Sequence, residues 1–398
     1  MSMLASGAAL GLSASTVVHA AGHGAASLWD AVVQGRTGLR RNDLSWCDLP
    51  CWIGEVPGVD DVVLPASLRG WDCRNHRLAW LALQDGMFRK AVDAAIARYG
   101  AHRVGLLLGT STSGIRSTEI AYAHRREHGR WPDHFDYRRS HAVDALCRFS
   151  ADVLKLQGPM VVMSTACSSS AKVFVSAHRW IDAGLIDAAV VGGVDSLCLS
   201  TLHGFHSLQL LSDDICRPFD AARSGVSIGE AAGFVLLDRA PAAVCYLGGG
   251  ESSDAWHMST PHPEGLGAQD AVRQALDAAV LAPADIGYVN VHGTGTPAND
   301  RSEAAALAAV FGDRGVPASS TKGVTGHALG AAGIVEAIVT AQALERQVLP
   351  PSANLRTPDP ACPLDLVMQP RAADLRHAMS NSFGFGGSNC TLIFGRPN

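Results

Sequence analysis

The sequence predicts an α/β fold built from two related halves. Short apolar runs typical of buried strands alternate along the chain with stretches whose apolar residues recur at helical spacing. The segment that begins at Cys167 also resembles the one that begins at His327, 160 residues later, where Ala171, Val175 and Ala177 have identical counterparts. The length of 398 residues suits two or three ordinary domains or one duplicated fold. The internal similarity favours duplication, with the halves facing each other across one site.

The first half is predicted to begin with a strand and loop in residues 1–22, followed by a helix over 25–34 that ends at Gly35. Residues 74–99 predict a long helical region, and residues 104–108 a buried strand. That strand ends in a turn of small hydroxyl residues, 109–114, which is not a phosphate-binding loop because no Gly-Lys pair follows. A strand end at 161–162, a helix behind Cys167, and strands within 185–199 and 232–237 complete this half.

The second half repeats the same order of elements. We expect a helix over 268–280, a strand over 288–291, a helix over 301–311, a long small-residue helix over 327–344 and a closing strand, CTLIF. The predicted division places residues 1–240 in the N-terminal half, which carries Cys167, and residues 241–398 in the C-terminal half.

Composition restricts the class of protein. Hydrophobic residues make up 47% of the chain and charged residues 17%, below the usual fraction of about 25%, so we expect much buried surface, including surface between subunits. A net charge of −5 with scattered signs gives no reason to expect a nucleic acid as partner. No apolar run is long enough to span a membrane, and no Lys or Arg precedes Arg36, as a secretory leader would require. The prediction is an oligomeric protein of the cytoplasm.

The ten cysteines show no Cys-x-x-Cys pair, which predicts reduced thiols. Cys47 and Cys51 stand close in sequence, but no second pair of ligands for zinc is near. Cys167 is different because it stands at a strand-to-helix turn. Unpaired backbone N–H groups and the positive end of the helix dipole there are expected to lower the thiol pKa below its free value of about 8.5. The same N–H groups could hold a developing oxyanion.

The stretch 123–140 is the most basic part of the chain, with five arginines against three acidic residues. It could be a solvated loop or helix face, or it could dock an acidic partner by charge steering. The sequence does not decide between these interpretations. The candidate docking residues are Arg125, Arg126 and Arg130.

Four further stretches carry residues suited to chemistry. His292 follows a predicted strand at a Gly/Thr turn, the edge where open α/β sheets usually meet their ligands. Lys322 and His327 lie five residues apart in STKGVTGHALGAAGIVE. Residues 253–265 form a polar, aromatic stretch, and residues 381–389 are glycine-rich with two phenylalanines. Each histidine alone is more often a structural residue, so the set as a whole carries the argument.

As a set, the motifs TACSSS, RPFD, SDAWHM, HGTGTxxND, KxxxGHxxGAAG and NSFGFGG resemble the β-ketoacyl-[acyl-carrier-protein] synthases of the elongating type, condensing enzymes of the thiolase superfamily. The resemblance covers roughly residues 100–395. It implies a thiolase-like duplicated fold, layered α-β-α-β-α, with two mixed five-stranded sheets. It also implies an acyltransferase that condenses malonyl groups, with loss of carbon dioxide, with an acyl group held on Cys167.

The resemblance assigns the catalytic roles to Cys167, His292, His327 and Lys322. Cys167 is the expected nucleophile, and two neutral imidazoles would stabilise the enolate that decarboxylation leaves. Lys322 is expected to tune His327, with Glu336 as its carboxylate partner.

Further roles follow from the same resemblance. The backbone of Cys167 and Phe385 would form the oxyanion hole, and Phe385 would also gate the acyl pocket. Thr294 and Thr296 match positions that hold the phosphopantetheine arm. The supporting positions are Asp300, Glu303, Phe219 and Phe383.

The resemblance also implies the partners. Substrates would arrive on the phosphopantetheine of acyl-carrier protein, without a bound metal, nucleotide or other cofactor. The protein would be a homodimer, or a heterodimer with a homologous subunit of the chain-length-factor type.

Departures from the family pattern leave the subfamily open. The first strand is followed by no TGxGxVxPxG pattern, and LASGAALGLSAST stands there instead. Fatty-acid, aryl-polyene and polyketide elongation are all considered. An alternative is a non-catalytic chain-length-factor-like subunit, which the intact Cys-His-His set disfavours. A thiolase that uses coenzyme A would need a second catalytic cysteine, and Cys390, the nearest candidate, falls in the predicted closing strand.

Overall fold

One mixed sheet of twelve strands runs through the computed structural model, which describes residues 8–397. Its order is β14-β12-β11-β16-β17-β10-β1-β9-β7-β5-β6, and β2 (Gly22–His23) pairs with β1 outside this path. The strands of the first half are β1 (Leu10–His19), β5 (Val104–Gly109), β6 (Met160–Met163), β7 (Ala188–Asp195) and β9 (Ala231–Asp238). Those of the second half are β10 (Cys245–Ser253), β11 (Ile286–Asn290), β12 (Pro317–Ser319), β14 (Asp365–Leu366), β16 (His377–Gly384) and β17 (Ser388–Gly395).

The two mixed sheets that the resemblance implies are joined in the structure into one continuous sheet. β1 pairs along its length with β9 and, at Leu10 and Gly11, also pairs antiparallel with Tyr246 and Cys245 of β10. β1 therefore has a partner on each side and links the halves. The chain itself passes from β9 to β10 through a short connection. The predicted α/β class and its mixed strand directions are confirmed, whereas the division of the chain at residue 240 stays a prediction.

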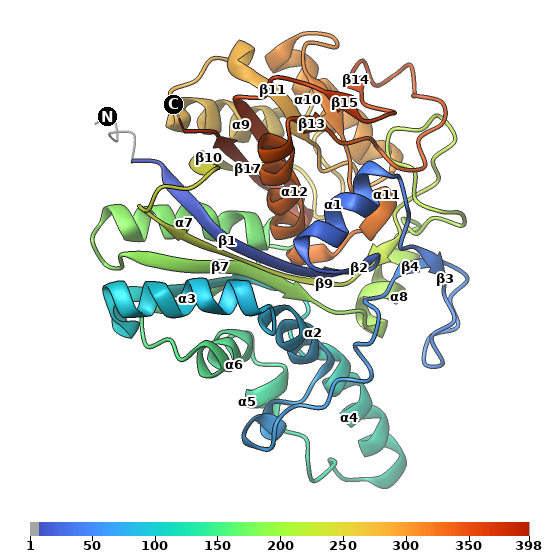
Figure 1. Cartoon of the computed structure of the whole chain (residues 1–398). Coiled ribbons are helices and arrows are strands. Elements are labelled where there is room, and N and C mark those ends of the chain that lie inside the picture. The colour runs from blue at the N-terminus through green and yellow to red at the C-terminus, as the bar shows by residue number, and fades with distance from the viewer. Residues whose placement is uncertain (1–7, 398) are drawn as a thin grey trace.

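Helices cover both faces of each half of the sheet and also fill the space between the halves (Figure 1). The outer helices of the first half are α2 (Arg74–Leu83), α3 (Gly86–Tyr99) and α6 (Ala145–Leu154), and those of the second are α9 (Leu266–Ala279) and α10 (Pro297–Phe311). Between them lie α7 (Ser169–Asp182) and α12 (Ala332–Arg346), and α1 (Ala25–Val33) packs against α12. The predicted five layers are therefore present.

The two central helices touch each other at their N-terminal ends. A Cβ added at Gly333 of α12 would lie 2.8 Å from the backbone nitrogen of Ala171 in α7, so only glycine fits at this approach. The predicted likeness of the two segments is reproduced with one difference. Cys167 stands two residues before its helix, whereas a 3₁₀ turn, Leu329–Ala331, separates His327 from α12. The small residues of both helix starts thus bring the two halves together beside these side chains.

The predicted helical region 74–99 is two helices. The Asp85 carboxylate accepts hydrogen bonds of 2.9 Å from the backbone N–H groups of Met87 and Phe88, so it caps a new helix in the middle of the periodic pattern. Periodicity alone does not reveal such an interruption, because both helices present apolar residues to the same sheet.

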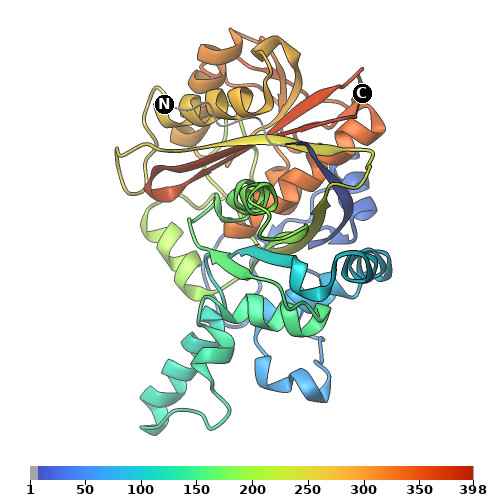
Figure 2. The same cartoon turned by 90° about the vertical axis from the view of Figure 1, so that its left-hand side faces the viewer.

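Residues 115–141 project from the body of the molecule (Figure 2). They contain α4 (Ile115–His128) and α5 (Tyr137–Ser140), and α4 packs against α8 (Leu199–Ser207). A small three-stranded sheet contains β3 (Arg40–Arg41), β4 (Trp52–Gly54) and β8 (Ile228–Gly229), and a two-stranded sheet contains β13 (Val348–Leu349) and β15 (Arg371–Ala372). Helix α11 is short (Lys322–Thr325). Within residues 8–397, no helix combines the length and apolarity needed to cross a membrane.

Candidate active site

Cys167 lies in a strained turn between β6 and α7. The residue before it, Ala166, has a φ of 51°, a left-handed conformation that costs a non-glycine residue free energy. Ser169 holds the turn: its hydroxyl donates to the Ala166 carbonyl at 2.6 Å and accepts from the Thr165 N–H at 2.9 Å. The turn therefore presents the Cys167 side chain toward the second half, where it is buried.

Cys167 and two histidines converge from different halves of the molecule. The Sγ atom of Cys167 lies 2.9 Å from Nε2 of His327, and the rings of His327 and His292 stand edge to face with centroids 5.2 Å apart. The three side chains offer a sulfur and two ring nitrogens that all lie within 4.8 Å of one another. The structure thus brings together the three residues that the motifs singled out.

Burial controls the protonation of this group. It raises the pKa of the Cys167 thiol to about 12, against the opposing effects of the Lys322 charge and the Phe385 N–H. The expectation of a lowered thiol pKa is therefore wrong, because loss of solvation outweighs the groups that favour the thiolate. Burial first, and then the charge of Lys322, holds the pKa of His292 and of His327 well below the ordinary value. The resting group is a neutral thiol beside two neutral imidazoles.

Lys322 bonds to His292 rather than to His327. Its Nζ atom donates to the His292 carbonyl and to Glu336 Oε1, and lies 3.4 Å from Nδ1 of His292. The expected Lys322–Glu336 pair is thus present, but Lys322 influences His327 only through its charge. A lysine donor at Nδ1 leaves the proton of the neutral His292 ring on Nε2.

Glu303 supports the backbone of the His292 turn. Its carboxylate accepts bonds of 2.8 Å from the N–H groups of both His292 and Gly293, and a bond of 3.2 Å from the Asn381 side chain. Burial raises the pKa of Glu303 to about 7, although these donors favour the ionised form. Glu303 therefore acts on the shape of the turn and does not line the pocket.

Asp300 supports the other end of the same turn. It accepts from the N–H of Gly295 at 3.2 Å and from the N–H of Phe219 at 2.8 Å, and it pairs with Arg223 at 3.1 Å. The side chain of Phe219, another of the supporting positions, is fully buried and packs beside Gly293. Both residues hold the 292–296 turn from behind.

Phe385 lies in the glycine-rich segment next to Cys167. Its backbone N–H points at the Cys167 sulfur, and its ring stacks on Phe205 of α8 with centroids 5.1 Å apart. Gly386 and Gly387, at φ values of 76° and 74°, follow it in a conformation that favours glycine. The roles of Phe385 as oxyanion donor and gate stay predictions.

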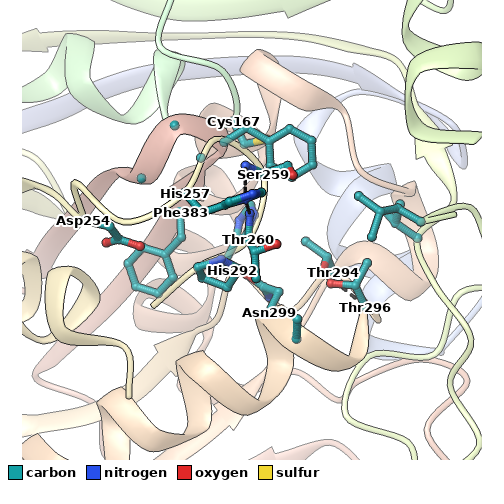
Figure 3. A pocket seen from close by; sticks show the side chains of 18 of the residues that line it. Cys167, Asp254, His257, Ser259, Thr260, His292, Thr294, Thr296, Asn299 and Phe383 are labelled. Atoms are coloured by element: carbon teal, nitrogen blue, oxygen red, sulfur yellow. Dashed lines mark hydrogen bonds between the residues drawn. The ribbon is translucent and has the colours of Figure 1, made fainter. Parts of the chain in front are cut away.

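A pocket of about 680 Å³, its open mouth included, leads to Cys167 (Figure 3). Thr294 and Thr296 line it, with their hydroxyls 2.9 Å apart, and so do His292, His327 and the other aromatic residue of the glycine-rich segment, Phe383. Sequence reasoning did not assign roles to the remaining walls. These walls are Phe205, Leu210, Val226, Asp254, His257, Ser259, Thr260, Pro261, Ala298, Asn299 and Asn389, with Gly384, Gly386 and Gly387.

Some of the pocket-lining residues without an assigned role lie in a stretch that the sequence had marked as a motif. The stretch 253–265 was singled out as a motif, and Asp254 now proves to join it to the glycine-rich segment through Asn389 at 2.7 Å and the Gly387 carbonyl at 2.9 Å. Phe205, Leu210 and Val226 carried no signal in the sequence, because apolar residues of this kind occur throughout the core.

The candidate docking arginines lie on the projecting segment, apart from the pocket walls. Arg125 stacks on the ring of Trp131 at 4.6 Å, and Arg130 pairs with Asp133 at 2.9 Å. Arg126 is exposed and has no ion pair within residues 8–397. The structure shows that these side chains are accessible but does not bring them to Cys167.

The other cysteines remain outside this site. All ten are free thiols, so Cys47 and Cys51 form no disulfide. Cys390 lies within β17, fully buried and away from the pocket walls, and burial raises the pKa of its thiol. Cys390 therefore does not occupy the position of the second catalytic cysteine that a thiolase would require.

Comparison with known proteins agrees with this geometry. Two family models match in succession: "Beta-ketoacyl synthase, N-terminal domain" over residues 76–243 and "Beta-ketoacyl synthase, C-terminal domain" over residues 243–356. "Nodulation protein E" of Rhizobium meliloti is 37% identical over 304 residues, 73% of this chain and 75% of that protein. "3-oxoacyl-[acyl-carrier-protein] synthase 2" of Staphylococcus aureus is 36% identical over 312 residues, 74% of this chain and 77% of that protein.

Solved structures extend the likeness over the whole chain. A chain of the complex of a ketosynthase with its chain length factor from Xenorhabdus doucetiae matches with a TM-score of 0.88, 39% identity and complete coverage (100%) of both chains. A beta-ketoacyl synthase from Burkholderia phymatum matches with a TM-score of 0.87 and 30% identity, over 98% of this chain and 100% of that one. With the converging cysteine and histidines, these matches show that the chain belongs to the beta-ketoacyl synthase family of thiolase-like fold.

Proposed function

We propose that the protein is a 3-oxoacyl-[acyl-carrier-protein] synthase, an acyltransferase that condenses a malonyl group with an acyl group held on Cys167. The observation that carries this proposal is the 2.9 Å contact between the Cys167 sulfur and Nε2 of His327, with His292 beside it at the end of an open pocket. The relative from Staphylococcus aureus, whose name states this activity, supports it. The proposed chemistry needs no metal or nucleotide.

The first step loads the acyl group. Because the resting thiol is neutral, His327 Nε2 takes its proton as the sulfur attacks the thioester carbonyl. The carbonyl oxygen becomes an anion, which the backbone N–H groups of Cys167 and Phe385 receive. The bond from carbon to the carrier sulfur then breaks, and the carrier thiol leaves with the proton that His327 held. The acyl group remains on Cys167.

The second step forms the new carbon–carbon bond. The malonyl group loses carbon dioxide, and the electron pair of the broken bond becomes an enolate. Once Cys167 is acylated, its sulfur no longer donates to Nε2 of His327, so the neutral His327 ring can carry its one proton on Nε2. N–H groups of His292 and His327 then stabilise the enolate oxygen, which suits two imidazoles that burial keeps neutral. The enolate carbon attacks the acyl-Cys167 carbonyl, the Cys167 sulfur leaves as thiolate and takes a proton from solvent, and the lengthened 3-oxoacyl chain stays on the carrier.

Polar groups on the pocket wall suit the arm that delivers both substrates. A phosphopantetheine arm is long and carries amide groups, and the hydroxyls of Thr294 and Thr296, 2.9 Å apart, belong to residues that line the same pocket as His292. We therefore assign these two threonines to binding of the arm, and acyl-carrier protein as the partner that presents it.

We also propose that the chain pairs with a second subunit of the same fold. Strand β6 lies at the end of the sheet and exposes 42% of Met160. Among residues 8–397 no other strand than β5 pairs with it, which leaves one strand edge available for a partner. The complex of a ketosynthase with its chain length factor supports a partner of this kind. The native mass of the assembly distinguishes a homodimer from a heterodimer.

The test of the proposed function is the mass of the protein after incubation with acyl-carrier proteins that bear fatty, polyunsaturated or 3-oxoacyl groups. We expect the wild type, but not Cys167→Ala, to gain the mass of one acyl group. Cys390→Ala, which removes a buried thiol outside the pocket, should load normally. The preferred group distinguishes fatty-acid, aryl-polyene and polyketide elongation, and native mass reports the dimer.

An adduct on Cys167→Ala would contradict the assignment of the nucleophile. If the wild type gains no group from any carrier, alone or with its partner, the chain is a non-catalytic subunit of the chain-length-factor type.

A further inference from the structure

Asp195 is a buried carboxylate that the proposed chemistry does not use. It ends strand β7 and its side chain is fully buried. Within residues 8–397, no lysine, arginine or histidine lies within 4.0 Å of it, although burying an unpaired charge is costly. Such a group needs compensation by hydrogen bonds, and its partners show which segments it ties together.

The compensation comes from the small-hydroxyl turn that follows β5. Asp195 accepts from the hydroxyls of Thr110 at 2.6 Å, Ser111 at 2.5 Å and Thr112 at 2.9 Å. It also accepts from the backbone N–H groups of Ser111 at 2.8 Å and Thr112 at 2.9 Å. The sequence showed only that the turn at 109–114 is not a phosphate-binding loop. In the structure its hydroxyl and N–H groups supply the hydrogen bonds of the Asp195 carboxylate.

One further bond crosses to the other half of the molecule. The N–H of Gly330 donates to Asp195 Oδ2 at 2.6 Å, and Gly330 follows His327 by three residues. A Cβ at Gly330 would lie 2.8 Å from that carboxylate oxygen and 2.9 Å from the Ser111 nitrogen, so the site has no room for a side chain. Asp195 thus fixes the backbone just after the catalytic histidine.

The other side of His327 is fixed by β8. Its N–H donates to the Ser227 carbonyl at 2.8 Å, and its carbonyl accepts from the Gly229 N–H at 2.9 Å. The segment from His327 to Gly330 is therefore held between β8 and Asp195, and the position of the imidazole depends on both anchors.

The same network touches the turn that carries the nucleophile. A Cβ at Gly193 of β7 would lie 2.5 Å from the Ser170 Cβ, and one at Gly109 would lie 2.4 Å from the Ser170 nitrogen, so the start of α7 rests directly on the ends of β7 and β5. The ends of β7 and β5, with Asp195, therefore contact both the start of α7 behind Cys167 and the segment that follows His327.

We infer that Asp195 is a positioning residue that locks the His327 segment onto the 109–114 turn and so sets the distance between His327 and Cys167. The inference rests on the proposed function for its kinetic consequence. Its geometric consequence, the reactivity of the Cys167 sulfur, does not depend on condensation.

The first test measures condensation and thiol reactivity on the same variants. Asp195→Asn keeps the shape but cannot accept all six donors, so we expect kcat to fall about tenfold or more, because small displacements of a base are costly, while KM for the malonyl carrier stays within about threefold. Ser111→Ala, at an exposed position, should give a smaller loss of kcat with the wild-type melting temperature. Ser113→Ala is the control, because the Ser113 hydroxyl faces the Ser140 and Ala142 carbonyls and does not touch Asp195.

The second readout is the pH at which iodoacetamide alkylates Cys167, followed by peptide mass. The negative charge of Asp195 disfavours the thiolate, so Asp195→Asn should move the alkylation midpoint to lower pH. Lys322, Glu336, His292 and His327 also face the thiol and are unchanged in this variant. A residue that served stability alone would not move this midpoint in a folded variant.

Unchanged kcat together with an unchanged alkylation profile in folded Asp195→Asn would overturn the inference. A wild type that does not condense, but whose alkylation midpoint still shifts on substitution, would overturn the proposed function and leave the effect of Asp195 on the Cys167 thiol intact.

Discussion

At the scale of single residues, the reactivity of the site depends on how completely it is buried. Burial keeps the Cys167 thiol protonated and both imidazoles neutral. A single proton transfer over 2.9 Å, from the Cys167 sulfur to Nε2 of His327, therefore generates the nucleophile. The two histidines differ in what they face: Nε2 of His327 lies against the sulfur, whereas Nδ1 of His292 lies against Lys322. We therefore expect His327 to act in both steps and His292 in the condensation step.

Replacement of each histidine should separate the two steps. His292→Ala is expected to acquire the acyl group at a near wild-type rate and to condense about a hundredfold more slowly, because an enolate donor is lost. His327→Ala should slow both reactions, because it also removes the base beside the thiol. Single-turnover loading by mass and product formation measure these rates, with the exposed His203 replaced as control. Equal loading rates in the two variants would contradict the assignment.

At the scale of elements, the projecting helix α4 connects a basic surface to the pocket. Its Glu119 caps α8 by accepting from the N–H groups of Leu199 at 3.0 Å and Ser200 at 2.7 Å, and α8 carries Phe205 of the pocket wall. The arginines at the far end of α4 are therefore attached firmly to the element that borders the pocket. Docking of an acidic carrier at these arginines stays a prediction.

Reversal of charge on α4 tests this docking surface. Arg125→Glu with Arg126→Glu should raise KM for carrier-bound substrate about threefold to tenfold and leave kcat unchanged, because rim charges act mainly on association. The effect should shrink as salt is added. Arg273→Glu, an exposed arginine on α9, is the matched control. The same KM in the double variant and the control would assign the arginines to ordinary solvated surface.

At the scale of the whole molecule, buried histidines link stability to pH. His76 lies under α6, stacked on Phe149 with ring centroids 4.6 Å apart, and Nδ1 lies 2.7 Å from the Trp71 carbonyl. Burial lowers the pKa of His76 to about 4 from 6.5. Between these pH values the unfolded chain binds a proton that the folded protein does not, so stability is lost as pH falls from 6.5 toward 4.

Removal of this titration should flatten the pH dependence of stability. His76→Gln is expected to lose less melting temperature than the wild type between pH 7 and pH 5, scanned by calorimetry. The slope should decrease without disappearing, because burial also lowers the pKa of His19, to about 3. Replacement of exposed His203 should leave the slope unchanged. An identical slope in His76→Gln would show that the protonation of His76 does not differ between the folded and unfolded states.

The sequence determined the class of fold, the family and the residues that could react. These features are carried by short contiguous motifs, and TACSSS, HGTGT and GHALGAAG each place one reactive side chain at a turn whose local residues allow little else. The repeat of the Cys167 segment around His327 also indicated two halves before any long-range contact was known. Local pattern was sufficient to find these residues because each motif is short and contiguous in sequence.

Only the tertiary structure decided how these residues act on one another. The thiol pKa depends on burial by segments far apart in the chain, so the local helix dipole predicted its direction wrongly. Lys322 neighbours His292, Phe205 stacks on Phe385 in the pocket wall, and Gly330 bonds to Asp195; these contacts join residues separated by 30 to 180 positions. Such contacts leave no periodic signal in sequence, because they arise when the two halves of the sheet and the two central helices pack together.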